Sequence, residues 1–425
     1  MSNKLNILKY YLLFRYRKFY SARQLKFFQK RMINRHLSFV TENSPFYHRF
    51  MGKMLESLPI IDKKIMMDNF DIINTVRINK DEAMEFAVNS ERKRSFSPKL
   101  HNITVGLSSG TSHSRGIFLV EDSEKDKWAG FVLAKFLERG ITAKYNVAFF
   151  MRANSNLYES VGSSDIRFEF FDIYADLENN IDRLRSFNAD IIVAQPSMLL
   201  ILARKIESGR LSIHPETVIS IAEVLEKEDE QILKRAFGLD VIHQVYQCTE
   251  GCLATTCRCG TLHLNEDIVY IEKEYIDKRR FIPIITDFER TAQPVIRYKL
   301  NDVLVEREYE CPCGSVFTAL ERIEGREDDV FVFNGTDGKA VKVFPDFIRR
   351  CILFAGDISD YRIVQRSDGG IDIFCDVSSL IKEKISEEFR QLSADKSFLL
   401  PELRFYPYSC EKGRKLRRVE SQRKT

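Results

Sequence analysis

The sequence predicts an α/β protein in two parts, a large N-terminal domain followed by a small α+β domain. The first part is predicted to hold parallel strands joined by helices, because short apolar runs alternate there with segments of helical periodicity. The apolar runs are Asn146–Met151, Ile191–Ala194, Thr217–Ile221 and Val241–Val245, and the helical segments are Ser197–Ser208 and Glu226–Phe237. The C-terminal segment carries a second pattern of helices and strands of its own.

Ahead of this alternation the chain is predicted to be mostly helical. A short strand at Ile103–Leu107 leads into a loop of small polar residues, and Gly116–Val120 is predicted to return as a second strand. A helix is expected at Ser123–Arg139 with Ser123 as its N-cap, because a serine side chain there accepts a hydrogen bond from the first turn.

The domain boundary is placed at Glu324–Asp329, a charged segment that contains a glycine. It divides the chain into residues 1–325 and residues 326–425. Helices and strands predicted after the boundary suffice for a small α+β domain: Phe344–Phe354 and Ser378–Leu392 as helices, with Tyr361–Gln365, Ile371–Asp376 and Glu402–Tyr406 as strands.

Residues 1–43 form a basic helical extension. Residues 1–36 contain ten Lys and Arg and no Asp or Glu, whereas the whole chain carries a net charge of only +4. The favoured interpretation is an amphipathic helix that packs on its own domain and exposes a basic face, and peripheral contact with an anionic membrane is the alternative. No repeat, zinc-finger spacing or RNA-binding signature supports a nucleic-acid partner.

Hydropathy and cysteine usage predict a cytoplasmic protein. No apolar run approaches the roughly 18 residues that span a bilayer, and the short apolar stretch near the N-terminus lacks the pattern of a signal peptide. The chain has nine cysteines. In a reducing compartment, clustered cysteines indicate metal binding or catalysis before they indicate disulfides.

Three short segments, far apart in the chain, make sense together as one nucleotide site. The run Ser108–Ser112 sets small hydroxyl residues around a glycine, and such a run can wrap a polyphosphate with hydroxyls and backbone N–H groups. Tyr246–Gly251 places a Thr-Glu pair after an aromatic residue, a combination suited to a phosphate, a magnesium ion and a purine face. Gly325–Asp329 has the composition of a charged hinge.

With these residues in view, the chain resembles the adenylate-forming superfamily, near the phenylacetate–coenzyme A ligases and the synthetases that adenylate a deazaflavin coenzyme. The resemblance runs from Ser44, in a Ser-Pro-Phe-Tyr motif, to Val419, in a late Lys-x-x-Arg-Val motif. It implies a large multi-sheet adenylation domain with a small cap domain. It also implies that a carboxylate attacks the α-phosphate of ATP, which gives acyl-AMP and pyrophosphate, and that an acceptor, expected to be coenzyme A, then takes the acyl group.

The resemblance also implies a role for each matching residue. Residues expected to cradle the β- and γ-phosphates are Ser108, Ser109, Gly110, Thr111 and Ser112. Residues expected around the rest of the nucleotide are Ala222 and Glu223 along the adenine and acyl pockets, Tyr246 on the adenine, Thr249 on the α-phosphate, Asp302 on the ribose hydroxyls and Arg326 on the ribose or phosphate. A carboxylate such as Asp302 suits two hydroxyls because its two oxygens accept in parallel.

Two further residues are expected to act in catalysis, and a third is expected to act as the pivot for rotation of the cap domain. Glu250 would hold Mg²⁺, a hard cation that prefers carboxylate oxygen. Lys415 would bridge the carboxylate and the phosphate, where an ammonium neutralises charge that develops in the transition state. Asp328 would be the pivot about which the cap domain rotates between the two half-reactions.

The cysteines predict a zinc site. Cys257, Cys259, Cys311 and Cys313 lie in two C-x-C-G segments and offer four thiolates, a usual ligand set for structural zinc. Some phenylacetate ligase relatives have a metal-binding cysteine cluster in this region. Two reduced, unrelated loops or a redox pair are the alternatives. Within the zinc interpretation, one ligand can be replaced by a nearby residue: Cys248, Cys252 or His263.

Two other functions remain open at this point. Gly106–Gly110 satisfies the G-x-S-x-G motif of α/β-hydrolases, which would make Ser108 a nucleophile. A homologue that binds nucleotide without turnover is the second alternative, because fold does not dictate function. The same motifs are compatible with an amine, alcohol or phosphate acceptor, and they carry no information on the carboxylate or on the oligomeric state.

Overall fold

The protein divides into two compact units. The computed structural model describes residues 2–93, 95, 98–108, 116–151, 160–326, 329–356, 358, 360–409 and 417–423. The first unit comprises Met1–Leu300 and Glu306–Arg322, and the second comprises Asn301–Val305 and Ile323–Thr425. The second unit is continuous from Ile323 onward. It also takes in an earlier strand segment, Asn301–Val305, that the sequence assigns to the N-terminal domain.

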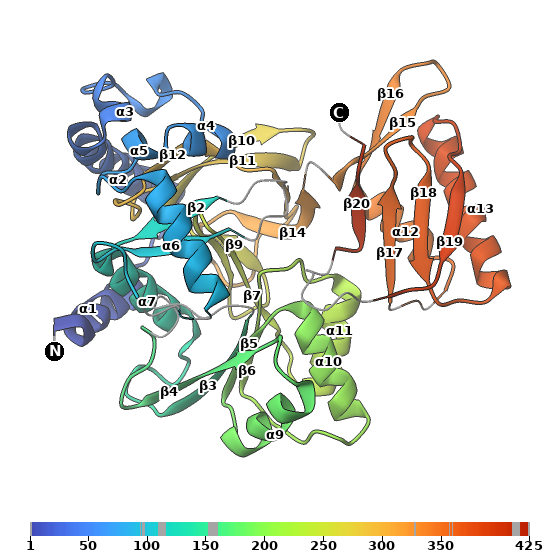
Figure 1. The fold of residues 1–425 in the computed structure, drawn as a ribbon, viewed down its shortest axis with the longest axis horizontal. Coiled ribbons are helices and arrows are strands. Elements are labelled where there is room, and N and C mark those ends of the chain that lie inside the picture. The colour runs from blue at the N-terminus through green and yellow to red at the C-terminus, as the bar shows by residue number, and fades with distance from the viewer. Residues whose placement is uncertain are drawn as a thin grey trace. The chain divides into compact units, whose positions relative to one another are not determined.

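Five neighbouring strands in the first unit run parallel in the order β4-β3-β5-β6-β7. They are β3 (Tyr145–Met151), β4 (Ile166–Asp172), β5 (Ile191–Ala194), β6 (Thr217–Ile221) and β7 (His243–Cys248). Helices α9 (Leu177–Phe187), α10 (Pro196–Glu207) and α11 (Lys227–Phe237) connect them, in green in Figure 1. Because these strands are short and apolar, they pack their side chains with those of the helices into one buried cluster. The predicted α/β class is confirmed.

Beyond β7 the sheet becomes antiparallel, which the sequence did not indicate. The antiparallel neighbours are β8 (Gly251–Thr256), β9 (Leu262–Leu264) and the start of β14 (Ala319–Arg326). The connection from β7 to β8 is only the turn Thr249–Glu250, and a turn that short joins antiparallel strands, whereas a parallel pair needs a crossover. A second antiparallel group holds β10 (Val269–Tyr275), β11 (Arg280–Asp287) and β12 (Val295–Lys299).

A hairpin precedes the sheet and leads into helix α7. Strands β1 (Thr104–Leu107) and β2 (Ile117–Val120) pair antiparallel, as the sequence predicts. Helix α7 (Asp122–Phe136) follows, but its N-cap is Glu121 and not Ser123. The Glu121 side chain accepts from the backbone of Glu124, and the Glu124 carboxylate accepts from the Glu121 N–H at 2.6 Å, so a reciprocal capping box starts the helix two residues earlier than expected.

The N-terminal extension packs on the first unit. Helix α1 (Ser2–Tyr16) lies against α7, where a Cβ on Gly130 would come within 2.8 Å of the Tyr11 backbone nitrogen. Arg17 stacks between Phe14 of α1 and Phe28 of α2 and donates to the carbonyl of Asp267 at 3.0 Å. The remaining helices of this region are α2 (Ala22–Asn43), α3 (Pro45–His48), α4 (Lys63–Asp68), α5 (Phe70–Ile73) and α6 (Lys80–Arg92), with a 3₁₀ turn at Leu55–Ser57.

No helix in the described part of the chain is both long enough and apolar enough to cross a bilayer.

The second unit is a small α+β fold, drawn in orange and red in Figure 1. Its sheet has the order β19-β18-β17-β20, in which β17 pairs antiparallel with β18 and parallel with β20. The elements are β15 (Phe331–Asn334), β16 (Ala340–Val343), α12 (Pro345–Leu353), β17 (Tyr361–Gln365), β18 (Ile371–Cys375), α13 (Ser379–Lys396), β19 (Leu403–Tyr406) and β20 (Val419–Ser421). The two helices and the sheet share one buried core, so this unit has the interior that an independent domain requires.

Candidate functional site

The carboxyl ends of β6 and β7 bring two of the predicted nucleotide motifs together. The strands are parallel neighbours, with Ile221 opposite Val245, so Ala222, the first residue after β6, lies level with Tyr246, which is still within β7 and pairs with Ala254 of β8. The carboxyl edge of parallel strands is where open α/β sheets bind ligands. The sequence predicted both motifs, and the strand register places them next to each other.

The chain makes a strained turn directly after β6. Ala222 has a positive φ of 66°, and the Glu223 N–H donates to the carbonyl of Ile221 at 2.8 Å. This i→i+2 hydrogen bond around a left-handed central residue is a rare and costly γ-turn. The Glu223 carboxylate accepts from the N–H of Ser197 at 3.3 Å, in the first turn of α10, so a helix N-terminus holds the residue after the turn in place.

The turn between β7 and β8 carries Thr249 and Glu250. The Thr249 hydroxyl donates to the Glu250 carboxylate at 2.8 Å, so the two polar groups lie together. Tyr246 is only 9% exposed and sits beside a β-bulge between itself and Gln247. A bulge re-aims the side chains of a strand near a site. The Cys248 thiol donates to the Gly251 carbonyl at 3.7 Å across the turn.

Tyr298 lies against Glu250, an arrangement that its sequence motif alone did not assign. Burial raises the pKa of the Tyr298 hydroxyl, and the charge of Glu250 and a hydrogen bond to that carboxylate raise it further. The phenol therefore stays protonated and donates to the carboxylate. Its neighbour Arg297 has a structural role, because its guanidinium donates two hydrogen bonds, of 2.8 and 3.0 Å, to the Glu272 carboxylate.

Arg290 connects the Thr249 turn to the hairpin β1–β2, and sequence inspection did not identify it. Its guanidinium donates to the carbonyl of Thr249 at 3.1 Å and to the carbonyl of Leu119 at 3.0 Å. Its Nε lies 3.9 Å from the buried carboxylate of Glu124. A planar, always charged fork suits such a junction because it holds several acceptors in fixed directions. Nothing in the spacing of residues 287–293 could have revealed it.

A buried acid lies beneath the same turn. A Cβ on Gly251 would fall 2.6 Å from Oδ2 of Asp287. Glycine is therefore required at this position because the Asp287 side chain leaves no room for a Cβ, and not because of the backbone conformation. Burial raises the pKa of Asp287 to about 7, which the positive charge of Arg290 partly opposes. The carboxyl therefore titrates near neutral pH directly under the Glu250–Gly251 peptide.

The base of the predicted phosphate loop is well defined. The N–H of Ser108 donates to the carbonyl of Gly116 at 2.8 Å, and the Ser108 hydroxyl accepts from the N–H of Gly116 at 2.7 Å. These bonds bring the two ends of the loop together at the end of the β1–β2 hairpin. The other predicted loop residues lie outside the described residues: Ser109, Gly110, Thr111 and Ser112.

The remaining predicted nucleotide residues belong to the second unit. Nε of Arg326, at the end of β14, lies 3.9 Å from Oδ1 of Asp302, at the start of β13 (Asp302–Glu306). At the end of the hinge segment, Arg417 forms an ion pair with the buried carboxylate of Asp329. Asp328 and Lys415 lie outside the described residues.

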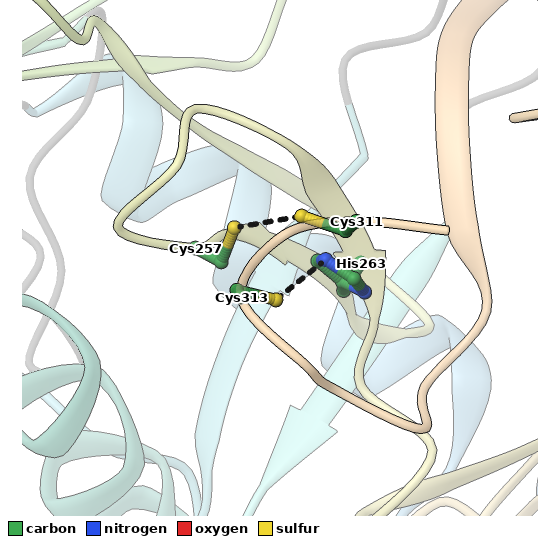
Figure 2. Close-up of side chains that lie close together, drawn as sticks. All are labelled: Cys257, His263, Cys311 and Cys313. Atoms are coloured by element: carbon green, nitrogen blue, oxygen red, sulfur yellow. Dashed lines mark hydrogen bonds between the residues drawn. The ribbon is translucent and has the colours of Figure 1, made fainter. Parts of the chain in front are cut away.

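A cluster of three cysteines and one histidine lies at the far end of β8 (Figure 2). Its members are Cys257, just after β8, His263 in β9, and Cys311 and Cys313 in the loop before β14. Their ligand atoms all lie within 4.8 Å of one another. Cys259 is exposed and is not a member, so His263, an alternative that the sequence left open, stands where Cys259 was expected. Cys248 and Cys252 are not members either.

Both C-x-C-G segments fold as turns that direct backbone N–H groups at sulfur. The N–H of Cys259 donates to Cys257 Sγ at 3.4 Å, and the N–H of Ser315 donates to Cys313 Sγ at 3.4 Å. The glycines that end the segments, Gly260 and Gly314, have φ values of 77° and 75°, a conformation that disfavours other residues. Cys259 therefore supplies a backbone donor and not a ligand.

Two distances within the cluster match the edges of a tetrahedral zinc site. Cys257 Sγ and Cys311 Sγ are 3.7 Å apart, and Cys313 Sγ lies 3.4 Å from His263 Nε2. Zinc–sulfur bonds of about 2.3 Å and zinc–nitrogen bonds of about 2.0 Å give tetrahedral edges of roughly 3.8 and 3.5 Å. His263 Nδ1 donates to the carbonyl of Phe317 at 3.1 Å, which leaves the Nε2 lone pair directed into the cluster. The residues present fit a structural zinc ion.

The environment also favours thiolates at two of the three cysteines. Burial opposes ionisation of Cys257, but backbone N–H donors from Cys259 and Thr261 outweigh it and lower its pKa. Burial likewise opposes ionisation of Cys311, and the Thr261 hydroxyl with the Cys313 backbone lowers its pKa. Thiolate is the form in which cysteine binds metal.

Two curated proteins are similar in sequence over parts of the chain, and no family profile matches it. Protein CapK of Staphylococcus aureus is 29% identical over 164 residues, which are 37% of this chain and 36% of CapK. Indoleacetate–lysine synthetase of Pseudomonas savastanoi is 24% identical over 238 residues, which are 50% of this chain and 56% of the synthetase. The alignments therefore span less than two thirds of either relative.

Solved structures match most of the chain, and two of the three named here match at least 90% of it. 2-Hydroxyisobutyryl-CoA ligase, in its postadenylation state with 2-HIB-AMP, has a TM-score of 0.70 at 16% identity, covering 95% of this chain and 90% of the ligase. GH3.15 acyl acid amido synthetase has a TM-score of 0.58 at 13% identity, covering 90% and 86%. The amide bond synthetase McbA from Marinactinospora thermotolerans has a TM-score of 0.54 at 12% identity, covering 72% and 66%. The chain therefore has the fold of the adenylate-forming ligases, as the resemblance of its motifs implied.

Proposed function

We propose that this protein uses ATP to activate a carboxylate as acyl-adenylate, with release of pyrophosphate, and then transfers the acyl group to the thiol of coenzyme A. One observation carries the proposal. The γ-turn at Ala222 follows β6 and the Thr249–Glu250 turn follows β7, and these strands are parallel neighbours, so both turns stand at the same carboxyl edge in a chain with the adenylate-forming fold. That edge is where this class of sheet binds ligands.

The chemistry divides into two transfers. In the first, a carboxylate oxygen attacks the α-phosphorus of ATP, and the bond to the bridging oxygen of pyrophosphate breaks. In the second, the thiol sulfur attacks the acyl carbon, AMP leaves with its phosphate oxygen, and the thiol proton passes to solvent. We assign the α-phosphate to Thr249, Mg²⁺ to Glu250 and the charge between carboxylate and phosphate to Lys415. Mg²⁺ held by Glu250 would neutralise phosphate charge.

The other roles follow the same assignment. Tyr246 is proposed to contact adenine, and Asp302 with Arg326 to contact the ribose. The loop Ser108–Ser112 is proposed to hold the β- and γ-phosphates, and Asp328 to act as the pivot of the second unit. Cys257, His263, Cys311 and Cys313 are proposed to hold one zinc ion with a structural role. We place the reaction in the cytoplasm, where the cysteines stay reduced.

An amine acceptor is the second candidate, and a specific observation favours it. The similar proteins include indoleacetate–lysine synthetase, an acyl acid amido synthetase and an amide bond synthetase, whereas the first solved structure named above is a CoA ligase. Both acceptors attack the same acyl carbon with loss of AMP. The proposals differ only in the second transfer, so one experiment separates them.

The test is a pyrophosphate-exchange screen over aryl, fatty and amino-acid carboxylates, with purified protein, ATP and Mg²⁺. The carboxylate that supports exchange is then incubated with coenzyme A or with lysine, and the product is identified by mass as thioester or amide. Amide without thioester would replace the thiol by an amine. A folded protein that binds ATP yet exchanges pyrophosphate with none of these acids would indicate a non-catalytic homologue.

The structure argues against the hydrolase alternative. In a nucleophile elbow, the serine lies on a sharp turn from a strand into a helix. Here Ser108 follows β1, and the next described element is the antiparallel strand β2. The Ser108 hydroxyl accepts a hydrogen bond from the N–H of Gly116, which is a structural role at the base of the loop.

A further inference from the structure

Helix α1 is apolar on two opposite faces, and the fold of the first unit covers one of them. The covered face holds Tyr11 and Phe14, both buried, with the Phe14 ring edge-on to Phe131 of α7 at 5.1 Å between centroids. A solvent-facing surface of a helix packed on its domain is normally polar. The opposite face of α1 is not.

The opposite face displays large apolar side chains to solvent. Leu5 is 70% exposed and Tyr16 is 73% exposed. Leu5, Leu12 and Tyr16 are seven and four residues apart, so they share one face of the helix. Two more exposed leucines flank this stripe, and we call the five together the α1 patch: Leu5, Leu8, Leu12, Leu13 and Tyr16.

Cations surround the α1 patch. Of the ten Lys and Arg in residues 1–36, every one except Arg17 is exposed, and this segment contains no Asp or Glu. Lys4, Lys9 and Arg15 lie on α1 itself. An apolar helix face with flanking cations is the pattern of helices that lie in the plane of a membrane interface.

We propose that the α1 patch inserts into the headgroup boundary of an anionic membrane and docks the enzyme there. A helix of 15 residues is about 22 Å long, which suits a position in the membrane plane and not across it. The basic residues of α1 and α2 complement anionic headgroups within a Debye length of the surface. The exposed leucines enter the acyl boundary while the opposite face stays packed on α7.

Charge favours a membrane over a second copy of this chain as the occupant. A symmetric dimer places the same patch of each copy against the other. Two such patches would bring two sets of cations together, and residues 1–36 offer no carboxylate to neutralise them. An anionic lipid surface provides both the apolar layer for the leucines and the counter-charge.

The test is co-sedimentation of the full-length protein with vesicles of phosphatidylglycerol and phosphatidylcholine in equal parts, against vesicles of phosphatidylcholine alone. Combined substitution of Leu5, Leu12 and Tyr16 by Ser should lower the partition coefficient at least about tenfold. The matched control substitutes Ser for three exposed apolar residues elsewhere, Tyr309, Leu380 and Leu399, and should bind as the unmodified protein does. Lys9→Gln should weaken binding about fivefold.

Three results would overturn the proposal. Equal partitioning of the α1 variant and the control, or no preference for anionic vesicles, would remove the patch as a docking surface. A concentration-dependent dimer in sedimentation velocity that the α1 substitutions abolish, with no vesicle binding, would make a second copy the occupant. Pyrophosphate exchange measured without lipid should be unchanged in the α1 variant, so the outcome is independent of the proposed reaction.

Discussion

The two ends of strand β8 carry the two candidate sites of the first unit, and they are held together in opposite ways. At the first end, protein groups hold the Thr249–Glu250 turn: Arg290 binds the Thr249 carbonyl, and Tyr298 lies against Glu250. At the other end, Cys257, His263, Cys311 and Cys313 point at one another (Figure 2). The proposed zinc ion would complete the four facing ligand atoms, whereas hydrogen bonds within the protein already hold the turn.

This difference predicts where each change acts. Loss of a ligand at the Cys/His cluster should reduce stability, because metal-binding energy is folding energy at a site of this kind. Loss of a group at the Thr249–Glu250 turn should reduce catalysis more than stability, because such groups act on charge that develops in the reaction.

The largest effect is expected from His263→Ala or Cys311→Ser. Each should abolish binding of about one zinc per chain and cost roughly 5 kcal/mol or more of unfolding free energy. Elemental analysis of protein purified without a metal-affinity tag, with thermal unfolding, measures both. Cys259→Ser is the matched control and should keep zinc and stability, because Cys259 is exposed and contributes only its backbone N–H. A metal-free preparation of full stability would show that these cysteines only form reduced loops.

Lys415→Ala tests the proposed catalytic role of the lysine that the second unit supplies. It should slow pyrophosphate exchange about a thousandfold, because the ammonium neutralises charge where two anions meet. Thioester formation from supplied acyl-AMP should be largely spared, since this step needs no such neutralisation. Arg414→Ala, in the same basic segment, should leave exchange intact. Full exchange activity in Lys415→Ala would rule out this lysine.

Glu250→Gln should slow pyrophosphate exchange about a hundredfold by weakening the proposed magnesium site. The fold should persist, because the amide is isosteric with the carboxylate. Glu274, which pairs with Lys299 on β12, supplies the control: Glu274→Gln should leave exchange unchanged. Normal exchange in a folded Glu250→Gln variant would place the metal elsewhere.

Arg290→Met should lower kcat for exchange by roughly tenfold to a hundredfold, because both the Thr249 turn and the β1–β2 hairpin lose a shared donor. The KM for the carboxylate should change less than kcat, and Arg290→Lys should restore part of the rate. Arg167→Met, an exposed cation on β4, is the comparison. If Arg290→Met and Arg290→Lys lost the same fraction of kcat and the same amount of unfolding free energy, Arg290 would act only on folding.

A separate prediction concerns the pH dependence of stability. Burial raises the pKa of Asp287 to about 7, so the folded state holds a proton that the unfolded state releases near pH 4. This contribution stabilises the fold at low pH and is lost as pH rises toward 7, with a slope of up to about 1.4 kcal/mol per pH unit. Asp287→Asn should remove this slope in urea unfolding measured between pH 4 and 7. If the difference in unfolding free energy between Asp287→Asn and the unmodified protein stayed the same from pH 4 to pH 7, the raised pKa of Asp287 would be contradicted.

Local patterns in the sequence anticipated much of the fold. The strands Ile191–Ala194 and Thr217–Ile221 are found with the predicted bounds, because a short run rich in β-branched apolar residues between two helical segments favours a buried parallel strand. The antiparallel strands after β7 were not anticipated. Val269–Tyr275 has three apolar or aromatic residues followed by three charged ones and so lacks the alternation of a half-buried strand, and its pairing with β11 depends on the rest of the sheet.

The sequence by itself determined the two C-x-C-G turns and the order of the nucleotide motifs, since both depend on neighbouring residues. Tertiary structure decided which atoms meet. His263 instead of Cys259 joins the cluster because β9 pairs with β14, which brings the loop of Cys311 and Cys313 beside the histidine. Arg290 contacts both the Thr249 turn and the β1–β2 hairpin because the fold brings these two segments, distant from it in the chain, to its guanidinium. Contacts between segments remote in the chain depend on packing, and no local spacing encodes them.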